Sequence, residues 1–337
     1  MGALLGAARA RRGWRPPLCV VVSAWVVWIL FAPQAAAAWC RMTTEQRMPS
    51  TSDQPCVREG VALAWRRRCI SYALDERGAS SLPFGDVQAI VRRSFLAWTA
   101  QSCGNALSGL QVVEHPNTAR CRDTQFCSNG PNVNNVAFVG DWFQRGVNAG
   151  VPGGYDPRAY AVTTVNIDLI SGEILDADMQ INEQNARYVV CPVNVVPNQP
   201  DPTGCPPETV GGLDIVDLEN VITHEAGHFF GLAHTPDDVR ATMYARTVPG
   251  EVSKRTLQPD DVGGYCEAYP PGSLPEACDF TPYGGVDLNC EDTSECEFRS
   301  NCSCRLASPT SLNSMAIAAA SLLALAWMLR LARRRRR

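Results

Sequence analysis

Residues 224–234 of this 337-residue chain read HEAGHFFGLAH, which is the spaced pattern H-E-x-x-H-x-x-G-x-x-H. His224 and His228 are four residues apart, so on a helix they lie on one face and can bind the same metal ion. A continuing helix would carry His234 away from that face. Gly231 can adopt the positive φ that ends a helix and turns the chain back, and we expect it to bring His234 to the same metal.

Three neutral imidazoles leave one coordination position of a zinc ion open, which is typical of catalytic rather than structural zinc. Zinc lowers the pKa of its bound water to about 7 and polarises a carbonyl oxygen. Glu225 would take the proton from that water and later pass it to the leaving amine. The alternative is a helix with a few surface histidines. Three of the four histidines in the chain lie in this one motif, which favours the metal site.

Residues after the motif carry a family resemblance. Met243 lies nine residues after His234, where metzincin proteases place a methionine turn beneath the metal. Residues 257–269, LQPDDVGGYCEAY, resemble the last helix of the matrixins, the matrix-metalloproteinase family. Thr235 also fits that family, which carries Ser or Thr directly after the third histidine. Residues 69–269 are therefore similar to a matrixin catalytic domain.

Residues 69–74 carry apolar side chains at Ile70, Tyr72 and Leu74, and this alternation is the pattern of a strand. Further strands are predicted at 110–114, 135–139, 161–168 and 177–182. Residues 86–100 instead repeat their apolar positions at helical spacing. The helix that carries the first two histidines is expected to begin near Asp214 or Asp217, because either side chain can cap it.

The matrixin resemblance implies an α/β fold of the α+β metzincin type. Its core would be a twisted, mostly parallel five-stranded sheet with an antiparallel edge strand, together with three helices, and a disulfide-rich segment would follow. Residues 161–168 would form the edge strand beside the cleft, where an extended peptide substrate pairs through main-chain hydrogen bonds. The resemblance implies that His224, His228 and His234 are the zinc ligands and that Glu225 is the general base. Gly231 would form the turn that ends the helix, and Met243 would form the methionine turn.

The sequence bears on two further metal sites, one for calcium and one for a structural zinc ion. Asp168, Asp176 and Asp178 can form a calcium site, because hard cations bind clustered oxygens. The alternative is that they are solvated turn residues, and the sequence favours that alternative. Animal matrixins hold a second, structural zinc with three more histidines and an aspartate. Only His115 is left over here, so that second zinc site is not expected.

The cysteine content indicates an exported, disulfide-bonded protein. Of the fifteen cysteines, Cys19 belongs to the leader, and the remaining even number suggests up to seven disulfides. Cys40 and Cys56 precede the matrixin-like region, which lacks the Pro-Arg-Cys-Gly switch that keeps animal matrixins latent. Either cysteine can cap the zinc, but a disulfide is the favoured expectation. Two further pairs are predicted, Cys191 with Cys205 and, as a weaker choice, Cys121 with Cys127.

Both ends of the chain carry targeting signals, and together with composition they predict five segments. These are a signal peptide (1–38), an N-terminal strap (39–68), the catalytic domain (69–270), a Cys-rich acidic stalk (271–305) and an apolar, Arg-rich tail (306–337). The tail resembles the tripartite sorting tail of myxobacterial surface proteins, which a membrane protease processes. A plain single-span anchor is the alternative. We therefore expect a bacterial protein that is exported and extracellular, or associated with the cell surface or outer membrane.

All 34 acidic residues but only 20 of the 30 basic ones lie between residues 39 and 311, which gives this body a net charge of −14. Such a charge disfavours nucleic acid and anionic lipid as partners of the body. The leading hypothesis is a secreted or surface-anchored zinc endopeptidase acting on proteins or peptides. One alternative is a non-catalytic surface binding or adhesion protein on a metzincin scaffold. The other is a zinc amidase that acts on cell-wall material.

Overall fold

The computed structural model describes residues 39–45, 56–148, 154–192, 205 and 209–290. The predicted signal peptide and the predicted C-terminal tail lie outside these residues. Within the part of the chain that is described, no helix is both long enough and apolar enough to cross a membrane.

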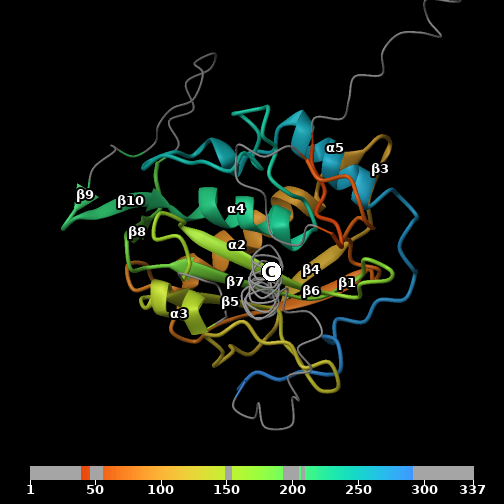
Figure 1. The fold of residues 1–337 in the computed structure, drawn as a ribbon, viewed down its shortest axis with the longest axis horizontal. Helices are drawn as coiled ribbons and strands as arrows, with labels where there is room; N and C mark the ends of the chain where they lie inside the picture. Colours follow the sequence, from red (N-terminus) through yellow and green to blue (C-terminus); the bar gives the residue numbers. More distant parts are fainter. Residues whose placement is uncertain (1–38, 46–55, 149–153, 193–204, 206–208, 291–337) are drawn as a thin grey trace, which may run out of the picture. The chain divides into compact units, whose positions relative to one another are not determined.

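The centre of the molecule is a five-stranded sheet in the order β4-β1-β5-β7-β6 (Figure 1). Its strands in chain order are β1 (Cys69–Leu74), β4 (Gln111–Glu114), β5 (Asn135–Val139), β6 (Ala161–Ile167) and β7 (Ile174–Asn182). The pairs β1–β4, β1–β5 and β5–β7 are parallel, whereas β6 runs antiparallel to β7 at one edge. The predicted α/β fold, a mostly parallel sheet with an antiparallel edge strand, is confirmed.

Four α-helices are described, one more than the three expected. They are α2 (Phe84–Thr99), α3 (Trp142–Asn148), α4 (Leu218–Phe229) and α5 (Pro259–Ala268), with a short 3-10 helix η1 (Ser253–Arg255) before α5. The additional helix, α3, is too short to show a helical repeat in the sequence. It is held in place by Trp142, which is fully buried and packs against Tyr155 at a ring distance of 4.8 Å.

Two small sheets complete the fold. One consists of β2 (Ser102–Cys103) and β3 (Ala106–Leu107). The other joins β8 (Ala186–Val189), β10 (Leu213–Asp217) and β9 (Thr209–Val210) in that order. The second sheet lies in the insertion between β7 and α4, and β10 leads directly into the first residue of α4.

The core lies where α2 and α4 pack together beside the sheet. Its centre is aromatic: Phe95 of α2 meets Tyr72 of β1 at 4.7 Å and Phe229 of α4 at 4.9 Å between ring centroids. Trp98 is fully buried, and its indole N–H donates to the Thr223 carbonyl at 2.8 Å. Such large side chains bury much apolar area, so they fix the distance between α4 and the sheet.

Disulfides fasten the outer segments to this body. Pairs in which both cysteines are described are Cys40–Cys56, Cys69–Cys278, Cys103–Cys266, Cys121–Cys290 and Cys191–Cys205. The expected Cys191–Cys205 pair is confirmed, and so is the expectation that Cys40 and Cys56 bond to each other. The expected Cys121–Cys127 pair is wrong, because Cys121 bonds to Cys290.

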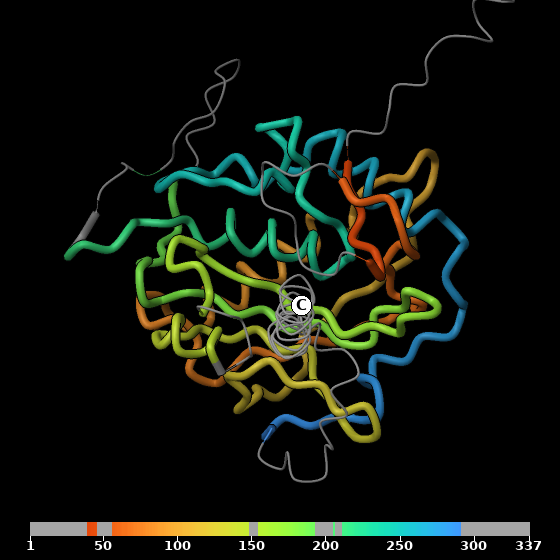
Figure 2. Tube along the Cα trace, in the orientation of Figure 1, coloured from red at the N-terminus to blue at the C-terminus, as the bar shows by residue number. Residues whose placement is uncertain are grey.

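The path of the chain after α5 explains why the predicted Cys121–Cys127 pair does not form. Residues 271–290 run back along the body, as the blue tube in Figure 2 shows. The Arg120 N–H donates to the Leu288 carbonyl at 2.6 Å, and Asn132 forms a β-bridge with Val286. This return brings Cys290 to Cys121, a contact that spacing along the sequence does not reveal. The first twenty residues of the predicted stalk therefore lie against the body.

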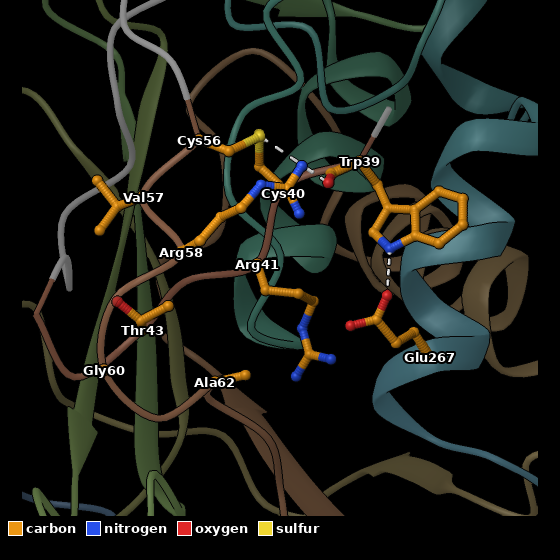
Figure 3. A pocket seen from close by; sticks show the side chains of 10 residues that line it. All are labelled: Trp39, Cys40, Arg41, Thr43, Cys56, Val57, Arg58, Gly60, Ala62 and Glu267. Atoms are coloured by element: carbon orange, nitrogen blue, oxygen red, sulfur yellow. Dashed lines mark hydrogen bonds between the residues drawn. A yellow bond between two sulfur atoms is a disulfide. The ribbon is translucent and has the colours of Figure 1, made fainter. Parts of the chain in front are cut away.

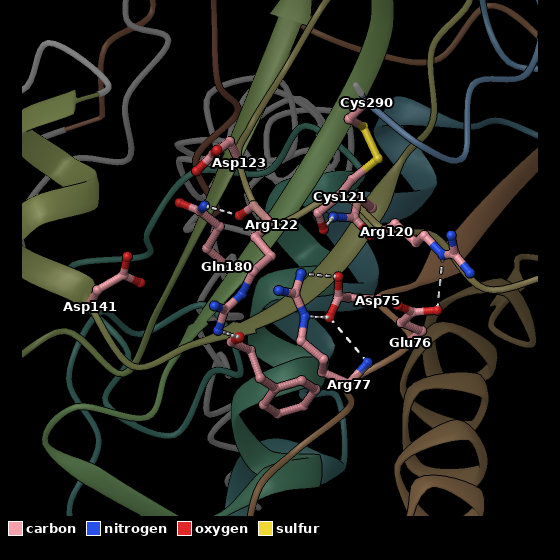
Figure 4. A network of polar contacts seen from close by, with 12 residues as sticks. Asp75, Glu76, Arg77, Arg120, Cys121, Arg122, Asp123, Asp141, Gln180 and Cys290 are labelled. Atoms are coloured by element: carbon pink, nitrogen blue, oxygen red, sulfur yellow. Dashed lines mark hydrogen bonds and ion pairs between the residues drawn. A yellow bond between two sulfur atoms is a disulfide. The ribbon is translucent and has the colours of Figure 1, made fainter. Parts of the chain in front are cut away.

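A polar network holds the loop around Cys121 to the sheet (Figure 4). Arg77 forms a two-pronged ion pair with the buried Asp75, and Arg122 donates to the Phe138 carbonyl of β5. Gln180 of β7 donates in turn to the Arg122 carbonyl at 2.6 Å. These contacts are structural, since none of them involves the histidine motif.

Candidate active site

Helix α4 positions the first part of the motif. Asp217 caps the helix, because its Oδ1 accepts from the Asn220 N–H at 2.8 Å. Arg255, the last residue of η1, also donates to the Asp217 carboxylate. Of the two expected caps, Asp217 is the one that the helix uses. Asp214 lies in β10 and accepts from the hydroxyl of Tyr160 instead.

Helix α4 ends at Phe229, and Gly231 lies in the turn that follows it. Its φ is +83°, and the Leu232 N–H returns to the Gly227 carbonyl at 3.0 Å. The N-terminal strap pairs with the turn: the Met42 N–H donates to the Gly231 carbonyl, and the Ala233 N–H donates to the Cys40 carbonyl, both at 2.9 Å. The turn that leads to the third histidine is therefore fixed from both sides.

Replacing Gly231 with alanine is expected to destabilise the protein by about 2–4 kcal/mol. Positive φ is unfavourable for a residue with a Cβ, and this Cβ would lie 2.5 Å from the Leu63 carbonyl oxygen. Zinc affinity should fall as well, because the turn carries His234. Thermal unfolding and zinc titration of Gly231→Ala test this. Gly104→Ala is the matched control, since Gly104 also has positive φ but no atom within 4 Å of its added Cβ. Equal effects in both variants would contradict the role of the close approach.

The three motif histidines converge. The Nε2 atom of His234 lies 3.2 Å from Nε2 of His224 and 3.1 Å from Nε2 of His228. Nitrogen ligands around one tetrahedral zinc ion are about 3.3 Å apart, given a Zn–N distance near 2.05 Å. Among the described residues, these three are the only cluster of three or more His, Cys, Asp or Glu side chains close enough to hold one metal ion. The donor set therefore fits zinc.

The other ring nitrogens set the tautomers of two ligands. Nδ1 of His224 donates to the Thr242 carbonyl at 2.6 Å, and Nδ1 of His228 donates to the Leu232 carbonyl at 2.8 Å. Both bonds leave the Nε2 lone pair directed at the shared centre. Burial lowers the pKa of His224 well below its usual value and that of His228 to about 3, and the neighbouring imidazoles add to both shifts. The rings are therefore neutral at pH 7, as metal ligands must be.

Glu225 directly follows His224 on α4 and is buried, with 5% of its surface exposed. Its Oε2 accepts from the Thr163 hydroxyl at 2.6 Å. Burial raises the pKa of Glu225 to about 7, and the Thr163 hydrogen bond opposes that rise. A carboxyl group with a pKa near 7 can both accept and return a proton at neutral pH.

Met243 lies under the helix, as the resemblance implies. It is fully buried, and a Cβ on Gly227 of α4 would lie only 2.1 Å from its sulfur. The Met243 carbonyl accepts from the Thr235 N–H at 2.9 Å, which joins the turn to the residue after His234. Met243 therefore packs against α4 and is joined to the residue that follows His234.

Two charged residues that the sequence analysis did not single out hold this turn. Asp261 of α5 is fully buried and accepts from the N–H groups of Thr242 and Met243 at 2.8 and 2.9 Å. Lys254 is the only lysine in the chain and is buried. Its ammonium group donates to the Tyr244 carbonyl at 2.7 Å and also reaches the carbonyls of residues 241 and 242. The turn thus lies between a carboxylate and an ammonium group.

The three aspartates of the predicted calcium site have different surroundings. Asp168 accepts from Ser171 and Ile170 in the turn after β6. Asp176 and Asp178 lie two residues apart on β7 and are buried. Asp178 accepts from the Asn135 N–H, whereas Oδ1 of Asp176 is buried without a hydrogen-bond partner. The calcium site stays a prediction.

The buried pair predicts a pH dependence of stability. Burial raises the pKa of Asp178 to about 7, and burial together with Asp178 raises that of Asp176. A raised carboxyl pKa means that the folded state binds the proton more tightly, so stability is lost as the pH rises from about 4 through about 7. Asp176→Asn should reduce the loss between pH 5 and pH 8 by on the order of 2 kcal/mol.

Chemical unfolding at both pH values measures this effect. Asp168→Asn is the control, because hydrogen bonds from Ser171 lower the pKa of that exposed carboxylate. An equal pH dependence in wild type and Asp176→Asn would contradict the prediction.

A pocket of about 140 Å³ lies between the strap and α5 (Figure 3). Trp39 and Glu267 line it and form a 2.6 Å hydrogen bond, and Arg41 and Arg58 lie on its other side. None of the motif histidines lines this pocket, so it is separate from the candidate active site. His115, the fourth histidine, bonds to Asn117 near the surface and also lies apart from the site.

Comparisons with known proteins agree with this geometry. Residues 160–270 match the Matrixin family model, and this range contains every residue of the site described above. A 53-residue stretch is 43% identical to Metalloendoproteinase 1 of Glycine max. That stretch is 16% of this chain and 17% of the soybean protein, so it spans under a fifth of that relative. The two matches support a matrixin-like metalloprotease. The family match ends before the predicted sorting tail.

Proposed function

We propose that this protein is an exported, zinc-dependent endopeptidase that cuts extended peptides. One observation carries the proposal: three buried or half-buried imidazoles bring their Nε2 atoms to one centre, and the buried Glu225 follows the first of them on the same helix. His224, His228 and His234 would hold one Zn²⁺. A histidine-bound zinc ion supplies Lewis acidity, which polarises the scissile carbonyl and makes water acidic.

The other parts of the reaction belong to the chain. Glu225 takes a proton from the attacking water and delivers it to the leaving amine, for which a pKa near 7 is suited. β6 is the edge strand of the sheet, and the hydroxyl group of its Thr163 contacts Glu225. An extended substrate would pair with this edge by main-chain hydrogen bonds, and its scissile carbonyl would then be held near the three histidines. The Thr242 carbonyl of the methionine turn orients His224, and the Leu232 carbonyl orients His228.

Two alternative functions would use the same histidines and Glu225. A binding or adhesion protein on a metzincin scaffold has no need of a buried carboxylate with a raised pKa beside the ligands. A zinc amidase would use the same ligands and base on cell-wall material. The peptidase is favoured because residues 160–270 match the Matrixin family, and because an exposed strand edge suits an extended polypeptide.

A cleavage assay separates these functions. The full chain, produced with export so that its disulfides form, is incubated with a mixed peptide library and, separately, with purified cell-wall fragments. Cleavage within peptides, with new amino termini identified by mass spectrometry, is the expected result. Release of amines from the wall fragments alone would favour the amidase. Zinc binding without turnover on either substrate would favour the binding protein.

Export, surface retention and calcium belong to the same proposal. Five disulfide pairs among the described residues suit an oxidising compartment outside the cytoplasm. Residues 306–337 would associate with the membrane or be removed by a sorting protease. Ca²⁺ would bind near Asp176 and Asp178. If it does, adding Ca²⁺ at pH 8 raises the unfolding temperature of wild type but not of Asp176→Asn, and equal shifts in both would exclude this site.

A further inference from the structure

The edge strand β6 places a single buried hydroxyl group in front of the proposed general base. Thr163 lies in the middle of β6, is paired in register with Met179 of β7, and has 4% of its surface exposed. Its Oγ1 lies 2.6 Å from Oε2 of Glu225 and 3.2 Å from the main-chain oxygen of the same residue. Both partners therefore belong to Glu225.

The hydroxyl has one hydrogen, so the shorter contact decides where it points. A separation of 2.6 Å lies within the range of charge-assisted O–H···O⁻ bonds. The main-chain oxygen of Glu225 lies inside α4, where helical carbonyls accept from the N–H four residues later. The Thr163 hydrogen is thus donated to the carboxylate. Glu225 can rotate about its side-chain bonds, and this contact fixes one of its two oxygens.

We propose that Thr163 is a positioning residue for Glu225, a role that rests on the proposed peptidase function. Its hydroxyl holds Oε2 toward the sheet, so that Oε1 is presented to the attacking water. Thr163 touches neither substrate nor metal in this role. The edge strand β6 would then bind the peptide substrate and also orient the carboxylate of Glu225. Substrate and proton acceptor would both be held by the same strand.

The test compares Thr163→Val, which keeps the shape but removes the hydroxyl, with Thr163→Ser, which keeps the hydroxyl. Steady-state kinetics of the full chain on a fluorogenic peptide should show that Thr163→Val lowers kcat about tenfold or more while KM changes less than about twofold. Thr163→Ser should recover most of kcat. Zinc content and unfolding temperature should stay close to wild type in both variants.

Thr99→Val is the matched control. The Thr99 hydroxyl also donates to an oxygen, the Phe95 carbonyl, but it lies on α2 away from the motif. Its kcat should equal that of wild type. An unchanged kcat in Thr163→Val would overturn the inference, and so would equal losses in Thr163→Val and Thr163→Ser. If wild type itself cuts no peptide, the proposed function fails instead, so the two failures are distinguishable.

A second measurement does not depend on turnover. Crystals of metal-free wild type should show one orientation of the Glu225 carboxylate, with Oε2 against Thr163. Crystals of metal-free Thr163→Val should show the carboxylate in more than one orientation or rotated. A single, unchanged orientation in the variant would show that packing alone holds Glu225, and it would overturn the positioning role.

Discussion

Glu225→Ala is expected to lower kcat on an unfolded protein such as casein by about 10²–10⁴-fold. In the proposed reaction this carboxylate takes the proton from water, and no Asp or Glu among the described residues belongs to the metal-binding cluster itself. The side chain is not a metal ligand, so zinc content should stay at one ion per chain. Casein hydrolysis and metal analysis of the same sample measure both quantities.

Glu225→Gln is the control for shape, since it keeps the hydrogen-bond acceptor that faces Thr163 but cannot take up a proton. Its kcat should fall as far as that of Glu225→Ala. Substantial cleavage by either zinc-loaded variant would exclude Glu225 as the base. Loss of zinc together with activity would leave its role undecided between chemistry and structure, and Glu225→Asp would then test whether a shorter carboxylate restores zinc.

Asp261→Ala is expected to reduce the free energy of unfolding by about 3–5 kcal/mol. The carboxylate accepts from the backbone N–H groups of Thr242, Met243 and Gln258 at 2.8–2.9 Å, and it is fully buried. Its removal leaves these three N–H groups without an acceptor. Each such donor that water does not reach lowers the free energy of unfolding by about 1–3 kcal/mol. Chemical unfolding of wild type and variant measures the difference.

The same substitution should also weaken zinc binding, because the methionine turn supplies the Thr242 carbonyl that orients His224. Asp261→Asn, which keeps one acceptor oxygen, should lose less stability than Asp261→Ala. Glu219→Ala is the control for removing an acidic residue, since its ion pair with Arg93 lies at the surface of α2 and α4. A stability change in Asp261→Ala as small as in Glu219→Ala would contradict the proposed support of the turn.

The metal ligands could be predicted because they are local in sequence. Two histidines one turn apart, a glycine and a third histidine describe a helix and its end, and the structure places all three rings as that pattern requires. The kind of sheet was also predictable, because the resemblance implied a mostly parallel five-stranded sheet with an antiparallel edge strand. The order of its strands was not predicted. Helix α3 was not predicted either, since seven residues are too few for a period and Trp142 holds them by tertiary packing.

The supporting residues could not be found in this way. Thr163, Lys254 and Asp261 are 62, 29 and 36 residues from Glu225, and they reach the site only when the strand, loop and helix pack together. Thr163 looks like any residue of a strand, and Lys254 like a solvated side chain. Asp261 belonged to a recognised helix pattern, but its contact with the methionine turn is a property of the fold. The partner of Cys121 was predicted wrongly for the same reason. Its true partner, Cys290, lies 169 residues away in the sequence and reaches Cys121 only in the folded chain.

Activity as a function of bound zinc tests the central proposal most directly. The full chain is stripped of metal, dialysed and titrated with Zn²⁺ while casein hydrolysis and bound zinc are measured together. A zinc endopeptidase with one site requires activity to rise in proportion to zinc and to saturate at one ion per chain, and His234→Ala should neither bind nor cut. Cleavage by the metal-free protein, or full zinc occupancy without any cleavage, would contradict the proposed function.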